Sequence, residues 1–64
     1  MNENTFAEQL RTMRTTIGWS RDKMHDRIGV PKRTIEDWEA SRRTPPEYVQ
    51  RLILDRLQLE IDKH

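Results

Sequence analysis

The side chains best suited to chemistry in this sequence are arginines and lysines gathered in the middle of the chain. Residues 11–33 carry a net charge of +5, although the chain of 64 residues carries only +1 in total. Nine of the twelve basic residues are Arg, whose guanidinium group can donate paired hydrogen bonds to phosphate, carboxylate or guanine. The cationic middle of the chain is therefore the first candidate for a binding surface.

A second group of titratable side chains, Asp22, His25 and Asp26, has the i, i+3 and i+4 spacing of a metal or acid–base cluster on a helix. Two carboxylates and one histidine on a charged helix are more often a solvated face. The chain also lacks the Cys that a thiolate site would need, and no nucleophile, base and orienting group come together. We therefore expect no enzyme activity, no metal, no cofactor and no small-molecule substrate.

Short helices separated by glycine and proline must position these side chains. A first helix should begin after Asn4 and end at Gly18, because four apolar residues are spaced by four, three and four. Ser20 is predicted to be the N-cap of a second helix over about 21–28, which Gly29 ends. The apolar residues of the first helix are Phe6, Leu10, Met13 and Ile17.

A third helix begins near Pro31 or Lys32 and has a polar outer face. Its apolar residues, Ile35 and Trp38, lie three apart and can pack inward. Two short helices joined by a glycine-containing turn, with a polar second helix, describe a helix-turn-helix over about 20–41. Such a second helix can enter the major groove of DNA when packing fastens its inner face.

A C-terminal helix over about 45–62 is predicted by Thr44 and Glu47, which have the spacing of a capping box. Two apolar stripes run along this helix. The first stripe is expected to face the domain and consists of Tyr48, Val49, Leu52 and Ile53. The second stripe is expected to form the seam of a homodimer and consists of Leu54, Leu57 and Ile61. Packing of the second stripe on the first helix, within the monomer, is the alternative.

The chain is predicted to be all-α, because no segment alternates apolar and polar residues for long enough to form a strand. Its length and its 33% apolar content fit one domain over 1–64 with four or five helices. The longest aliphatic run has three residues, far fewer than a membrane span requires, and no export signal is recognisable. We therefore expect a cytoplasmic protein without a membrane partner.

The stretch from about Leu10 to Pro46 resembles the Cro/cI-type helix-turn-helix regulators, also called lambda-repressor-like or XRE regulators. The most specific part is the run GVPKRTIEDWE over 29–39. After it come two basic residues and a proline: Arg42, Arg43 and Pro45. This part is similar to the family's recognition helix with its terminal Trp-Glu pair and its basic loop. The resemblance implies a lambda-repressor-like domain that binds double-stranded DNA.

By this resemblance, seven polar residues are expected at the DNA. The basic ones would contact phosphates or base edges, and the two acids would face the groove. The seven residues are Arg21, Lys32, Arg33, Glu36, Asp37, Arg42 and Arg43. The resemblance also implies a structural salt bridge between Arg14 and Glu39. Two positions depart from the family pattern: His25 stands where Ala is usual, and Ser41 stands where Gly is usual.

These features lead to a main hypothesis and an alternative. The main hypothesis is a sequence-specific transcriptional regulator, a repressor or autorepressor, whose homodimer places two recognition helices in successive major grooves. The alternative is a protein-interaction module of the same fold, antitoxin-like or an adaptor, which binds a protein partner through the charged face of the third helix. The small net charge, together with Glu36 and Asp37, favours the alternative, because carboxylates repel phosphates.

Overall fold

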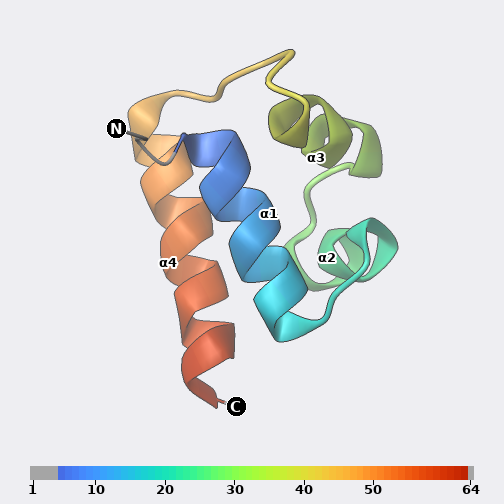
Figure 1. Cartoon of the computed structure of the whole chain (residues 1–64), viewed down its shortest axis with the longest axis vertical. Helices are drawn as coiled ribbons and strands as arrows, with labels where there is room; N and C mark the ends of the chain where they lie inside the picture. Colours follow the sequence, from blue (N-terminus) through green and yellow to red (C-terminus); the bar gives the residue numbers. More distant parts are fainter. Residues whose placement is uncertain (1–4, 64) are drawn as a thin grey trace.

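The computed structural model describes residues 5–63, which form four α-helices (Figure 1). The helices are α1 (Phe6–Ile17), α2 (Arg21–Ile28), α3 (Lys32–Glu39) and α4 (Glu47–Lys63). The described residues contain no strand, so the all-α prediction is confirmed. None of their helices is long and apolar enough to cross a membrane. The predicted domain also included residues 1–4 and 64, which lie outside the described range.

Side-chain caps and left-handed glycines set the ends of the short helices. The Ser20 side chain accepts a hydrogen bond from the backbone N–H of Lys23 at 3.1 Å, which satisfies a donor that the first turn of α2 leaves free. Gly18 and Gly29 follow α1 and α2 with φ angles of 90° and 87°, a region that glycine enters without steric cost. The predicted bounds of α2 are therefore confirmed.

The start of α4 differs from the predicted capping box. The helix begins at Glu47, and Thr44 is exposed in the loop before it. Pro46 disfavours a helical conformation at Pro45, so the helix does not begin there. Instead, the Pro46 carbonyl accepts the backbone N–H of Gln50 at 3.0 Å. The Gln50 side chain donates to the Pro45 carbonyl at 2.8 Å and ties the first turn of α4 to the loop before it.

The core forms where α1 contacts α3 and α4, and where α3 contacts α2 (Figure 1). Four of its side chains are completely buried: Leu10, Met24, Ile35 and Leu57. The rings of Phe6 and Trp38 meet edge to face with their centroids 5.6 Å apart, a geometry that aromatic pairs prefer. Trp38 is thus a packing residue, as its place in an apolar stripe predicts, and its burial fixes the inner face of α3.

The apolar faces of α4 require a correction. Tyr48 and Leu52, predicted to face the domain, are 70% and 64% exposed. Leu57, predicted on a dimer seam, is completely buried in the core of the single chain, and Leu54 packs against the same core. Ile61 is half-buried. The prediction of an open seam is wrong for Leu54 and Leu57, because they lie on the face of α4 that packs in the core of the single chain. For Ile61 it stays a prediction.

Candidate nucleic-acid interface

The turn between α2 and α3 is closed by hydrogen bonds on both sides of Gly29. The Gly29 N–H donates to the His25 carbonyl at 2.8 Å. The Nδ1 atom of His25 lies 2.8 Å from the Val30 carbonyl oxygen, so the ring ties α2 to the residue after the turn. His25 is exposed, and an imidazole therefore fits at this position without separating the two helices.

A buried carboxylate, Glu39, joins the end of α3 to α1 and α2. Its side chain is 1% exposed, and Arg14 donates to both of its oxygens, at 2.7 Å from Nε and 3.1 Å from Nη2. Arg21 donates to the same carboxylate at 3.1 Å. Arg14 also donates to the Trp19 carbonyl at 2.9 Å. The salt bridge implied for Arg14 is present, and Arg21 is a second partner that the sequence did not indicate.

The charge of Glu39 is set by its two arginines. Burial raises the pKa of its carboxyl group, but the hydrogen bond and charge of Arg14, followed by those of Arg21, outweigh burial and hold the pKa below its usual range. Glu39 is therefore ionised at neutral pH. A buried pair of this kind fixes the orientation of α3 against α1 more surely than it adds stability.

The first group of predicted DNA contacts lies where α2 and α3 begin. Lys32 and Arg33 are exposed on the first turn of α3, and Glu36 is half-buried one turn later. The Lys32 ammonium lies 3.1 Å from a carboxylate oxygen of Asp22, with the two side chains 50% and 75% exposed. A shallow hollow between the helices brings Arg21, Lys32 and Glu36 together. Arg21 keeps 40% of its side chain exposed, so it can still reach a ligand.

The second group lies at the end of α3, where Asp37 holds two arginines of the following loop. The Nε atoms of Arg42 and Arg43 lie 3.1 Å and 3.9 Å from the two oxygens of its carboxylate. The arginine side chains are 67% and 78% exposed, whereas that of Asp37 is 20% exposed. Asp37 was predicted to face the groove. Its carboxylate instead faces the loop, because the loop turns back beside α3.

Ser41 makes this turn possible. Its φ angle of 62° is left-handed, which confirms that it occupies the conformation for which the family usually has Gly. The Ser41 N–H donates to the Trp38 carbonyl at 3.1 Å, and the Arg42 N–H donates to the Asp37 carbonyl at 2.9 Å. These two bonds form a Schellman motif, which ends the helix and reverses the chain. A non-glycine residue at the left-handed position costs about 1 kcal/mol.

Comparison with known families agrees with this geometry. A family model described as a helix-turn-helix domain matches residues 5–63, nearly the whole chain. The chain belongs to this helix-turn-helix family. The family is part of the Cro/cI-like clan, so the resemblance seen in the sequence is confirmed. No curated protein and no solved structure matches the chain.

Two of the three residues that were considered as a metal or acid–base cluster, Asp22 and His25, have structural partners in the helix-turn-helix domain. Asp22 pairs with Lys32, and His25 bonds to the Val30 carbonyl. Within residues 5–63 no three potential ligands converge on a metal site, and Asp26 joins no such group. The pairings of Asp22, and of Asp37 with the loop arginines, were not predicted. For Asp37, the sequence offered one signal: two arginines follow it closely, just beyond the end of the predicted helix.

Proposed function

We propose that this helix-turn-helix domain is a sequence-specific DNA-binding regulator that inserts α3 into the major groove. The observation that carries the proposal is the exposed cationic group at each end of α3, a helix whose inner face is fixed by Ile35 and Trp38. α3 has eight residues and is therefore about 12 Å long, similar to the width of the major groove, about 12 Å. Cations at its two ends can reach the phosphates on both sides of the groove.

At the start of α3, Arg33 is the residue proposed to read a base. A guanidinium that pairs with O6 and N7 of guanine discriminates against the wrong base by about 1–3 kcal/mol. Glu36, one turn further along, can accept a hydrogen bond from the amino group of cytosine. Lys32 and Arg21 would contact phosphate, and a phosphate can replace Asp22 as the partner of Lys32 because that ion pair is exposed.

At the end of α3, Arg42 and Arg43 are proposed to hold the DNA backbone. Asp37 restrains both side chains beside α3 while most of their surface stays open to solvent. This role for Asp37 supports DNA over a protein partner. Glu36 and Asp37 favoured a protein partner, but the Asp37 carboxylate is already paired with Arg42 and Arg43. A restrained arginine also loses less side-chain entropy when it binds phosphate.

The finer part of the proposal is a repressor that acts as a homodimer. Two copies of α3 would enter successive major grooves, at half-sites about 34 Å apart. The described part of one copy extends 29 × 27 × 20 Å, so two copies side by side are long enough to cover both half-sites.

Selection of bound duplexes from a random DNA pool tests the function. The wild-type protein should enrich a motif with two spaced half-sites, and Arg33→Ala should relax the preference at one position of each half-site. Arg42→Ala should weaken all sequences by a similar factor. Lys63→Ala, which removes the same charge from the far end of α4, is the control. No enrichment above background would contradict DNA recognition and support a protein partner on the charged face of α3.

A further inference from the structure

The outer side of α4 carries three large apolar side chains that lie open to solvent. Tyr48 is 70% exposed, Leu52 is 64% exposed and Leu59 is 58% exposed. Spacings of four and seven residues place the three side chains within about 40° of one another around the helix axis. We refer to these three residues as the outer stripe.

The outer stripe points away from the core of its own chain. Leu57, which is completely buried, lies about 180° around the helix from Tyr48. α4 packs on α1, and Figure 1 shows α1 between α4 and the pair formed by α2 and α3. A second protein molecule can therefore cover the outer stripe and leave α3 free. An apolar row of this kind is a feature of protein interfaces.

We propose that two copies of this chain associate through the outer stripe, with their α4 helices antiparallel across a twofold axis. The proposal deepens the proposed function, because it assigns the surface that holds the homodimer. It rests on that function only for the role of the dimer on DNA.

The outer stripe is complementary to itself in this arrangement. With the twofold axis at the level of residue 53, Tyr48 of one copy lies within about one residue of the level of the partner's Leu59, and the two Leu52 side chains lie about 3 Å apart along the helix direction. The same register places Arg51 opposite the partner's Asp55. Both charged side chains are exposed and lie on the same flank of the stripe, and equal flanks meet in an antiparallel pair. The axis repeats each contact, which gives two Arg–Asp pairs beside the apolar row.

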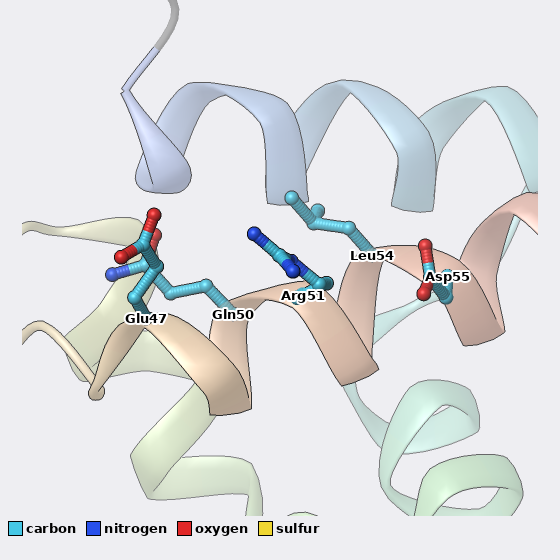
Figure 2. A pocket seen from close by; sticks show the side chains of 5 residues that line it. All are labelled: Glu47, Gln50, Arg51, Leu54 and Asp55. Carbon is cyan, nitrogen blue, oxygen red and sulfur yellow. The ribbon is translucent and has the colours of Figure 1, made fainter.

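Two hollows flank Arg51, and the one on the outer side of α4 has room for a side chain of the partner. One hollow is lined by Glu47, Tyr48, Arg51 and Leu52. It lies at the end of the stripe that would receive the partner's Leu59. The second hollow opens toward α1, and Figure 2 shows Leu54 reaching toward α1 with Arg51 and Asp55 beside it on α4. Arg51 lines both hollows and so marks the border between the inner and outer sides of the helix.

The length of α4 sets the expected strength of the dimer. The helix has 17 residues and is about 26 Å long, and it offers three apolar side chains from each copy. One such helix pair buries less than the roughly 1,600 Å² of a standard interface. We therefore expect a dimer that dissociates in the micromolar range.

Sedimentation equilibrium without DNA, from about 1 to 500 µM protein, tests the interface. The wild-type chain should form dimers, and Leu52→Glu should weaken them by at least about tenfold, because it places two carboxylates at the axis. Gln58→Glu adds the same charge to the same helix away from the stripe and should change the dissociation constant by less than about twofold. Leu52→Glu should unfold at the wild-type temperature, because the side chain is exposed. Gln58→Glu should unfold slightly below it, because it replaces the 2.9 Å hydrogen bond from Gln58 to Asp62 with two carboxylates one turn apart. A wild-type chain that stays monomeric, or Leu52→Glu that dimerises like the wild type, overturns the proposal.

Reversal of the charged pair tests the antiparallel register. Arg51→Asp and Asp55→Arg should each weaken the dimer by roughly three- to tenfold, because like charges then face each other. The two substitutions together restore opposite charges across the axis and should return the dissociation constant to within about twofold of wild type. A double variant weaker than either single variant would overturn the register.

A duplex that holds one half-site separates this proposal from the proposed function. Leu52→Glu should bind the single half-site as well as the wild type does, because α3 is unchanged. If the wild type binds the half-site but never dimerises, the outer stripe is not the interface and the proposed function stands. If the wild type dimerises through the stripe but binds no duplex, the proposed function fails and the interface stands.

Discussion

Glu39 and Asp37 each hold two arginines, yet their surroundings give the two clusters opposite roles. Glu39 is 1% exposed among three helices, whereas Arg42 and Arg43 stay mostly exposed around Asp37. Burial makes the same carboxylate–guanidinium chemistry difficult to break, because a charge that loses its partner there has no water to replace it. At the surface, water and salt screen the pair. The first cluster therefore fixes the fold, and the second leaves most of the surface of its arginines open to solvent.

The largest expected effect comes from Glu39→Ala. Arg14 is 13% exposed and would lose the buried carboxylate that it pairs with, so the free energy of unfolding should fall by about 3 kcal/mol. Asp37→Ala should lower it by less than about 1 kcal/mol, since its arginines can turn to water. Urea unfolding of both variants measures the difference. Equal losses would show that burial does not separate the two clusters.

Lowering the pH should also reduce the free energy of unfolding through Glu39, by somewhat less than Glu39→Ala does. The pKa of Glu39 is below its usual range in the folded chain, so its contribution to stability is fully present above the unfolded pKa of about 4.3. This contribution is lost as the pH falls through the folded pKa. Glu39→Gln has no carboxyl group to protonate at this position, so it should not lose this contribution in acid. The difference in unfolding temperature between the variant and the wild type should therefore shrink as the pH falls. A constant difference below pH of about 4 would contradict this.

The exposed cluster should control the salt dependence of DNA binding. Replacing Arg42 and Arg43 with Ala removes two phosphate contacts, so the slope of log affinity against log salt should become shallower by about 1.8. Binding to one duplex at several salt concentrations measures the slope. Arg14→Ala is not a suitable control because it damages the fold, whereas Lys63→Ala should leave the slope unchanged. An unchanged slope in the double variant would show that these arginines do not contact the DNA backbone.

The smallest effect is expected at Ser41, the residue between the two clusters. Ser41→Gly should raise the free energy of unfolding by a few tenths to about 1 kcal/mol, because glycine removes the left-handed strain and only partly offsets it with extra freedom in the unfolded chain. Ala40→Gly is the matched control. Its φ angle is −89°, so glycine should lower stability there. A loss of stability in Ser41→Gly would show that the left-handed conformation of Ser41 carries no strain that glycine can relieve.

The sequence predicted best where local chemistry decides the structure. Ser20 and Gly29 bound α2 as expected, because a cap and a left-handed glycine act within a few residues. The sequence failed on α4, where residues around Leu52 and residues around Leu57 form two stripes of similar strength. The structure divides the first stripe, because Ile53 and Val49 pack in the core as predicted whereas Tyr48 and Leu52 are exposed. It also buries Leu57 of the second stripe. The position of α1 decides this division, and periodicity within one helix carries no information about its neighbours.

The sequence predicted which residues belong to the candidate site, but not which of them pair with one another. The family resemblance named the residues at both ends of α3. It did not indicate that Asp37 would turn toward Arg42, because that contact depends on how the chain reverses at Ser41. Arg21 was likewise predicted only at a phosphate, and its bond to Glu39 joins residues 18 positions apart in the sequence.

The packing of α4 on α1 also has a consequence for synthesis on the ribosome. α1 is made first and α4 last among the four helices, and the cluster that contains Leu10 also contains Ile53 and Leu57. While α4 is still inside the exit tunnel, α1 has no cover on the side that α4 later occupies, and the nascent α1–α3 segment exposes apolar surface to chaperones and to other chains. Stable folding therefore has to wait until most of α4 has emerged, so a pause or truncation before Ile53 would leave a segment that is prone to aggregation.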